Sequence, residues 1–127
     1  MMNEIQKKAI ENTIKQWEAM LRMANEQDFN YACISGGYIQ YLKKKFCDTY
    51  NINMDSAHNC YLCQATLDGN EVVHCELCPA KKIHYAKTKV LGCWIKEFKN
   101  CVFSETFVEL KTNMQKFIDA LKKCLED

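Results

Sequence analysis

The sequence predicts one mainly α domain, in which a small β-hairpin is inserted between a long N-terminal helix and a long C-terminal helix. Apolar residues recur every three to four positions near both ends of the chain, which is the period of an amphipathic helix. Between the ends lies an Asp-Gly dipeptide, a strong signal for a tight hairpin turn. A chain of 127 residues has the length of a single domain, so residues 1–127 are assigned to one.

The N-terminal helix is expected over residues 4–25. Its apolar side chains recur at three- and four-residue spacing, so they share one face of a helix. Glu18 and Arg22 lie four residues apart on the other face, a spacing that favours an ion pair within the helix. The expected buried stripe consists of Ile10, Ile14, Trp17, Leu21 and Ala24.

The C-terminal helix is expected over about residues 105–125. Ser104 is a residue type favoured as an N-cap, and Phe103 and Val108 have the spacing of a hydrophobic staple around it. Because both terminal helices are amphipathic, we expect them to pack together and close the domain. The expected buried stripe of the second one consists of Phe107, Leu110, Met114, Phe117 and Leu121.

The pattern between the terminal helices is shorter. Residues 30–37 are expected to form a connection, and residues 36–48 a helix whose apolar residues include Tyr38 and Leu42. The run Lys43-Lys44-Lys45 is expected on the solvated face of that helix. A further short helix is expected over residues 88–100. The side chains that it would turn inward are Trp94, Ile95 and Phe98.

Composition disfavours several classes of function. The chain carries 17 Lys and Arg against 16 Asp and Glu, so its net charge of +1 favours neither nucleic acid nor a membrane surface. No run of about 18 apolar residues is present, and no membrane span is expected. The N-terminus, Met-Met-Asn-Glu-Ile-Gln-Lys-Lys, lacks the apolar stretch of a secretory signal, which predicts a reducing, cytoplasmic location.

Nine cysteines are many for this length, and an odd number disfavours a disulfide framework. Four of them form two C-x2-C pairs, Cys60 with Cys63 and Cys75 with Cys78, which can supply the four thiolates of a tetrahedral zinc site. The Asp-Gly turn between the pairs would bring them together. We therefore expect a zinc-binding hairpin over residues 55–82. The predicted fold class is mainly α with a small zinc-bound β-hairpin, a zinc-ribbon-like insertion between long N- and C-terminal helices.

The metal site leaves alternatives open. His58, His74, His84 or Cys93 is close enough in sequence to replace one of the four thiolates. Four thiolates leave no open position on the metal, so we expect the zinc to be structural and the protein not to be an enzyme. Thiol–disulfide exchange is the main rival, but too few residues follow Cys63 before the turn to form the helix that activates a catalytic C-x-x-C. The other cysteines are expected to be small buried side chains: Cys33, Cys47, Cys101 and Cys124.

Charge is distributed unevenly around the cysteines. Residues 46–80 contain five acids and no Lys or Arg. A zinc ion held by four thiolates would add about two further negative charges. An acidic segment stiffened by a metal fits a basic groove on another protein. The expected partner contacts are Asp55, Asp68, Glu71 and Glu76.

The next segment has the opposite charge and supports an alternative function. Residues 81–99 contain six lysines and one acid. They could belong to a nucleic-acid-binding or transcription-regulatory module, in which Tyr85 and Trp94 stack on bases. The simpler interpretation is that these lysines solvate one face of the protein. The expected nucleic-acid contacts are Lys81, Lys82, Lys87 and Lys89.

The cysteine segment over residues 60–93, with C-x2-C…C-x2-C-P and a further cysteine in Leu91-Gly92-Cys93, resembles small zinc-binding proteins of bacteriophages. The lysine-rich composition and the helical ends add a general similarity. The nearest specific kind is a zinc-containing anti-CRISPR inhibitor of a type II effector nuclease. The resemblance implies a viral protein of the host cytoplasm that binds a CRISPR effector nuclease and blocks its loading with nucleic acid.

Overall fold

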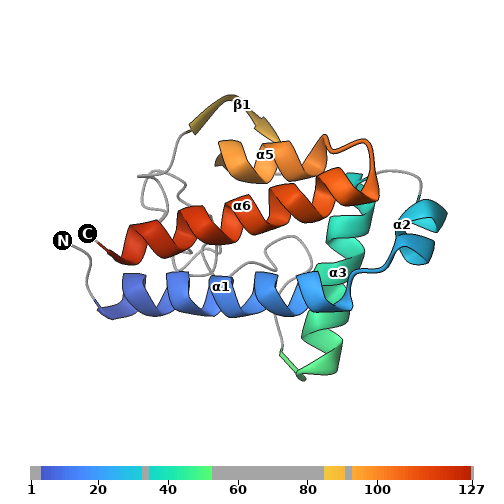
Figure 1. The fold of residues 1–127 in the computed structure, drawn as a ribbon. Helices are drawn as coiled ribbons and strands as arrows, with labels where there is room; N and C mark the ends of the chain where they lie inside the picture. The colour runs from blue at the N-terminus through green and yellow to red at the C-terminus, as the bar shows by residue number, and fades with distance from the viewer. Residues whose placement is uncertain (1–3, 33–34, 53–84, 91–92, 127) are drawn as a thin grey trace.

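The computed structural model describes residues 4–32, 35–52, 85–90 and 93–126. Helices make up most of this part of the chain (Figure 1). In chain order the elements are α1 (Glu4–Met23), α2 (Glu26–Ala32), α3 (Ser35–Thr49), β1 (Tyr85–Val90), β2 (Cys93–Ile95), α5 (Lys96–Val102) and α6 (Phe107–Leu125).

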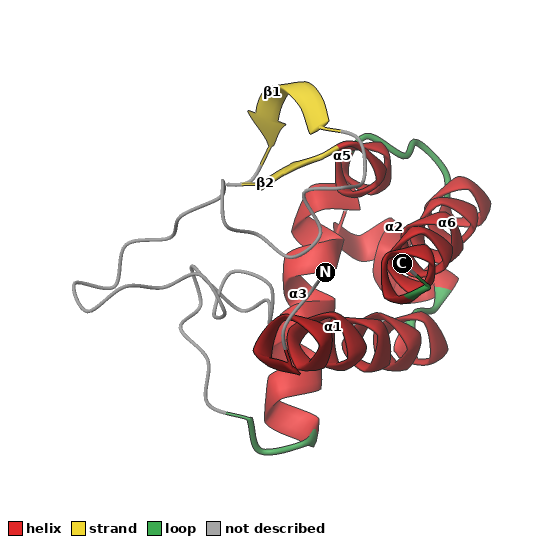
Figure 2. Ribbon diagram, turned by 90° about the vertical axis from the view of Figure 1, so that its left-hand side faces the viewer, coloured by secondary structure: helices red, strands yellow, loops and turns green. Residues whose placement is uncertain are grey.

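The terminal helices α1 and α6 pack side by side and run in opposite directions, so the two ends of the chain lie at the same end of the domain (Figure 1). Helix α5 lies along α6 on the side away from α1, and α3 crosses near the C-terminal end of α1 at a steep angle (Figures 1 and 2). The expected pairing of two long terminal helices is confirmed. Both are slightly shorter than expected, since α1 ends at Met23 and α6 begins at Phe107.

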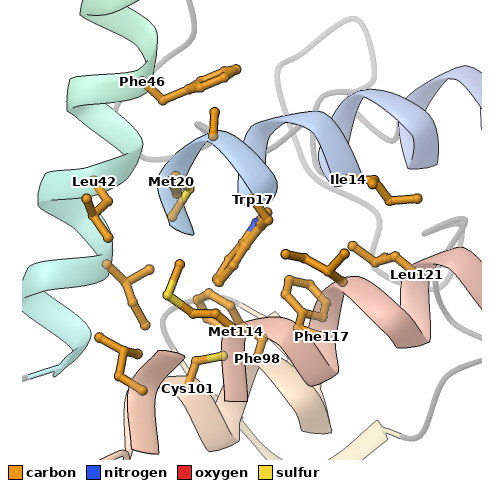
Figure 3. Close-up of a cluster of buried hydrophobic side chains, with 14 of the residues drawn as sticks. Ile14, Trp17, Met20, Leu42, Phe46, Phe98, Cys101, Met114, Phe117 and Leu121 are labelled. Atoms are coloured by element: carbon orange, nitrogen blue, oxygen red, sulfur yellow. The ribbon is translucent and has the colours of Figure 1, made fainter. Parts of the chain in front are cut away.

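The hydrophobic core lies where α1, α3, α5 and α6 meet, with Trp17 near its centre (Figure 3). The Trp17 ring stands edge-on to the ring of Phe98 in α5, with centroids 5.9 Å apart, and to the ring of Phe117 in α6, at 4.6 Å. Each such pair contributes roughly 0.5–1.5 kcal/mol beyond the burial of its area. Trp17 therefore joins three helices, as its place in the expected stripe indicates. The largest fully buried side chains are Trp17, Tyr38, Phe117, Ile10, Met20, Ile39, Leu42, Leu110, Met114, Ile118 and Leu121.

Helix α2 occupies part of the stretch expected to be a connection. Its first turn is capped by Asn25, whose Oδ1 accepts a hydrogen bond from the backbone N–H of Asp28 at 2.9 Å. This bond satisfies one of the free N–H groups that begin every helix. The hydroxyl of Tyr38 in α3 accepts a hydrogen bond from the Asn25 N–H, also at 2.9 Å, and so fixes the start of α2 against α3. The expected helix over 36–48 is confirmed as α3.

The start of α6 differs from the expectation. Thr106, rather than Ser104, is the N-cap: its backbone is extended and its hydroxyl accepts a hydrogen bond from the Glu109 N–H at 3.1 Å. The Thr-x-x-Glu spacing is that of a capping box. Phe103 and Val108 are both exposed, so the expected hydrophobic staple is wrong. The cap two residues later places Glu105, not Phe103, at the position before the N-cap.

The predicted fold class, with a zinc-bound β-hairpin inserted between the terminal helices, is wrong for the part of the chain that the structure describes. This part is predominantly helical. Its two strands, β1 and β2, form an antiparallel pair in which Tyr85 faces Ile95 and Val90 faces Cys93, beyond the expected hairpin. No group of three or more His, Cys, Asp or Glu residues able to hold a metal occurs among the described residues. Residues 55–82 lie outside them.

The short helix expected over residues 88–100 is only partly correct. Helix α5 begins at Lys96, and the residues before it form the two strands. In β1 the apolar or β-branched residues Ala86, Thr88 and Val90 alternate with lysines, which is the two-residue period of a strand. Phe98 is buried, as expected.

Candidate interaction surface and buried polar cluster

Lys43 is part of the core rather than of a solvated face. Only 6% of it is exposed, and its Nζ atom lies 4.9 Å from the centroid of the Phe98 ring. Lysine can bury its aliphatic stem along apolar surface, and an ammonium over an aromatic face is stabilised by the ring electrons. Lys43 therefore helps to hold α3 against α5.

The other two lysines of the run are engaged on the surface. Lys44 forms an ion pair with Asp48, one helical turn later, at 3.1 Å. The Nζ atom of Lys45 lies 5.9 Å from the centroid of the Tyr41 ring. The run Lys43-Lys44-Lys45 therefore does not present three free charges on one side. A basic patch that follows a phosphate backbone needs such free charges.

Two cysteines near Lys43 are held as neutral thiols. Burial, with the Glu97 carboxylate adding to it, raises the pKa of the Cys101 thiol to about 12. Burial and then the charge of Asp48 raise the pKa of the Cys47 thiol. The thiolate is the form that attacks a substrate or binds a metal. Both cysteines are therefore inert at neutral pH in this environment.

The expectation that the remaining cysteines are small buried side chains is confirmed for Cys101 and Cys124. Cys47 is only half-buried, and Cys33 lies outside the described residues.

Both carboxylate oxygens of Glu97 are also buried, and no residue that the structure describes donates a hydrogen bond to them. Lys43, the Glu97 carboxylate and Cys101 are therefore assigned to the contact between α3 and α5.

Ser104 is a buried junction between three helices. Its hydroxyl donates to the carbonyl oxygen of Asn100 in α5 at 2.9 Å and accepts from the side-chain amide of Asn113 in α6, also at 2.9 Å. The Asn113 amide additionally donates to the Asn100 carbonyl at 3.2 Å. The Ser35 hydroxyl, at the start of α3, donates to the carbonyl oxygen of Ser104. This network fixes the turn between α5 and α6.

The same turn exposes large apolar side chains. Phe103 is 62% exposed and Val108 is 71% exposed, and the acids Glu105 and Glu109 beside them are exposed as well. We call these four residues the α5–α6 corner. It lies at the end of the domain opposite the chain termini (Figure 1). The sequence places both apolar residues next to the start of the helix. That pattern predicted a hydrophobic staple between them and did not reveal that both are exposed.

Most of the expected site residues lie outside the described part of the chain. This holds for the expected zinc ligands and partner contacts, for Lys81 and Lys82, and for the three histidines. Lys87 and Lys89 lie in β1 and Cys93 lies in β2, where the structure describes the backbone. The expected zinc site, partner contacts and nucleic-acid contacts therefore stay predictions.

Comparison with known proteins gives no match to a family model, to a curated protein or to a solved structure. The resemblance to bacteriophage zinc proteins thus rests on the residues of this sequence alone. Among the helices that the structure describes, none is long and apolar enough to cross a membrane.

Proposed function

We propose that this protein acts without catalysis, by binding a basic surface of a larger host protein and inhibiting it. The observation that carries the proposal is the separation of charge in a nearly neutral chain: residues 46–80 hold five acids and no Lys or Arg. Opposite charges raise the rate of encounter and fix the orientation of two proteins. The contacts are the acids predicted from the sequence, with Asp68, Glu71 and Glu76 at the centre of the cysteine segment.

A structural zinc ion is part of the proposal. Four cysteine thiolates in two C-x2-C pairs are the donor set of a closed zinc site, which leaves no open position for catalysis. The metal would stabilise the acidic segment, so that less conformational freedom is lost on binding. Elemental analysis of protein purified without added metal should give one zinc per chain. Folded protein that is free of metal would remove this part of the proposal.

The specific form of the proposal is inhibition of a CRISPR effector nuclease. It rests on the resemblance of residues 60–93 to bacteriophage zinc proteins. Effector nucleases hold nucleic acid in positively charged channels. A protein that places an acidic surface in such a channel competes with the nucleic acid, because both need the same basic side chains. Inhibition would then take the form of blocked loading.

The arrangement of Lys43-Lys44-Lys45 supports protein binding over the alternative of nucleic-acid binding. That alternative needs several accessible lysines on one surface, and the described structure buries Lys43 and pairs the exposed Lys44 only weakly with Asp48. The lysines of residues 81–99 are the remaining candidates. A gel shift at physiological salt, lost when Lys81, Lys82, Lys87 and Lys89 are replaced, would put the nucleic-acid function in the place of the proposed one.

Charge reversal tests the proposed contacts. The variant changes Asp68, Glu71 and Glu76 to lysine, and its control changes three exposed acids of the helical domain. Both variants alter the net charge equally. Association with the protein captured from the host should slow markedly only in the first variant, and the parent's affinity should fall as salt rises. Equal affinities for both variants would refute the acidic-segment mechanism. The control residues are Glu4, Glu11 and Glu126.

A further inference from the structure

The α5–α6 corner exposes apolar area that the fold itself does not use. Phe103 follows the last residue of α5 and Val108 is the second residue of α6, and more than half of each is exposed. Single exposed apolar residues are common and need no explanation. Two of them within one short turn, one a phenylalanine, are a stronger indication, since aromatic side chains are enriched among the residues that anchor protein interfaces.

The turn that carries these side chains is fixed by hydrogen bonds to α5 and α6. Ser104 and Asn113 bind it to the end of α5 through hydrogen bonds of 2.9 Å and 3.2 Å. At its other end Thr106 caps α6, and Phe107 packs on Phe29 of α2 with ring centroids 5.7 Å apart. A fixed turn keeps Phe103 in place before binding. It therefore loses less conformational entropy on contact with a partner than a flexible loop would.

The exposed charges within the corner itself are acidic. Glu105 and Glu109 are exposed on either side of the cap, whereas Lys99, one helical turn before Phe103 in α5, is half-buried. The nearest lysine on α6, Lys111, has its Nζ atom 5.5 Å from the centroid of the Phe107 ring and is engaged there. An apolar centre with an acidic rim is complementary to a partner segment that carries apolar side chains between basic ones.

We propose that the α5–α6 corner is a docking site for a basic amphipathic segment of a partner protein. Apolar side chains of that segment cover Phe103 and Val108, and its lysines or arginines meet Glu105 and Glu109. The inference rests on the proposed function, because it supplies a second contact for the same kind of basic partner. It differs in that every residue involved lies at the end of α5 or the start of α6, and none belongs to residues 46–80.

A defined probe tests the site without knowledge of the partner. The probe is a synthetic helical peptide of leucine and lysine, and its control is the same peptide with glutamate in place of lysine. Amide NMR spectra of the labelled full-length protein should shift at residues 103–109 with the first peptide and not with the second. Variants Phe103→Ser and Val108→Ser should each weaken binding at least about fivefold.

The chain offers a matched control in Ile5. It is the second residue of α1, as Val108 is of α6, and it is equally exposed, at 71%. Ile5→Ser should leave peptide affinity unchanged. If it weakens binding as much as Val108→Ser does, the peptide binds by general hydrophobicity and the docking site is refuted. Circular dichroism confirms that each variant remains folded.

Two further outcomes separate this inference from its alternatives. The triple reversal of Asp68, Glu71 and Glu76 should retain its peptide affinity, since those acids are not part of the corner. If the reversal abolishes peptide binding while Phe103→Ser does not, the corner is refuted and the acidic segment is supported. If the protein forms dimers that Phe103→Ser dissociates, the occupant is a second copy of the chain, and the proposed basic partner is refuted.

Discussion

Replacement of Lys43 by alanine should destabilise the protein far more than the same change at its neighbour Lys44. Lys43 is 6% exposed, with its ammonium 4.9 Å from the centroid of the Phe98 ring. The change removes three buried methylene groups, at about 0.8 kcal/mol each, and a cation–π contact of about 2 kcal/mol. It also relieves the cost of keeping an ammonium group away from water, which offsets part of the loss. The expected decrease in the free energy of unfolding is about 2–3 kcal/mol.

Lys44 provides the control within the same helical turn. Its side chain is 77% exposed, and its ion pair with Asp48 is of the i,i+4 kind, worth roughly 0.3–0.5 kcal/mol. Lys44→Ala should therefore cost at most about 0.5 kcal/mol. Lys43→Met separates the two parts of the Lys43 contribution, because it keeps a long apolar side chain and removes the charge. Its expected cost is at most about 1 kcal/mol.

Urea unfolding, followed by both circular dichroism and tryptophan fluorescence, measures these differences. Trp17 is in contact with Phe98, so in a Trp94→Phe background its fluorescence reports the part of the core in which Lys43 lies. The slope of the free energy against urea should be the same in all variants, which shows that only stability has changed. Equal losses for Lys43→Ala and Lys44→Ala would refute the burial of Lys43 and with it the packing of α3 on α5.

The remaining predictions concern the start of α6 and the buried thiol. Thr106→Ala should cost about 1 kcal/mol by removing the N-cap. Ser104→Ala should cost about 1–2 kcal/mol by removing the two partly buried hydrogen bonds of its hydroxyl. If Thr106→Ala costs nothing in thermal unfolding, the helix does not begin there. Burial raises the pKa of Cys101 from 9.0 to about 12, so the folded state keeps a proton that the unfolded chain releases. The stability that this contributes is complete below about pH 9 and is lost as the pH rises toward about 12. Between about pH 8 and pH 10 Cys101→Ala should lose about 1 kcal/mol less stability than the parent, and an identical loss in both would contradict the raised pKa.

The long helices could be predicted because their signal is local. Each of α1 and α6 places apolar residues at helical spacing over most of its length, and burial of that stripe decides the fold of such segments. The ends could not be fixed in the same way. Ser104 and Thr106 are both suitable N-caps, and the choice between them depends on the folded state, in which Asn113 of α6 and the distant Ser35 of α3 bind Ser104.

The burial of Lys43 could not be predicted from its residue type, because a run of three lysines suggests exposure even where the spacing of the neighbouring apolar residues indicates burial. Three consecutive lysines suggest a solvated face. Yet Ile39, Leu42 and Phe46 are all buried, and position 43 completes the spacing of one helical face with them. The position therefore indicated burial and the residue type indicated exposure. The structure buries Lys43, and the aromatic ring of Phe98, from a helix far away in the sequence, stabilises its ammonium group there.

If the acidic segment and the α5–α6 corner contact the same partner, their effects on affinity should combine. Distant contacts contribute independently, so the free-energy losses of the triple reversal and of Phe103→Ser should add within roughly 0.5 kcal/mol in the variant that carries both. Salt should weaken the contribution of the charged residues and leave that of Phe103 nearly unchanged, because screening acts on charges and not on apolar burial. The measurement is the affinity of the four proteins for the captured host protein at low and at high salt. A Phe103→Ser variant that binds this protein as tightly as the parent would refute a contact between the corner and this protein, since the Phe103 ring would then remain in water in the complex.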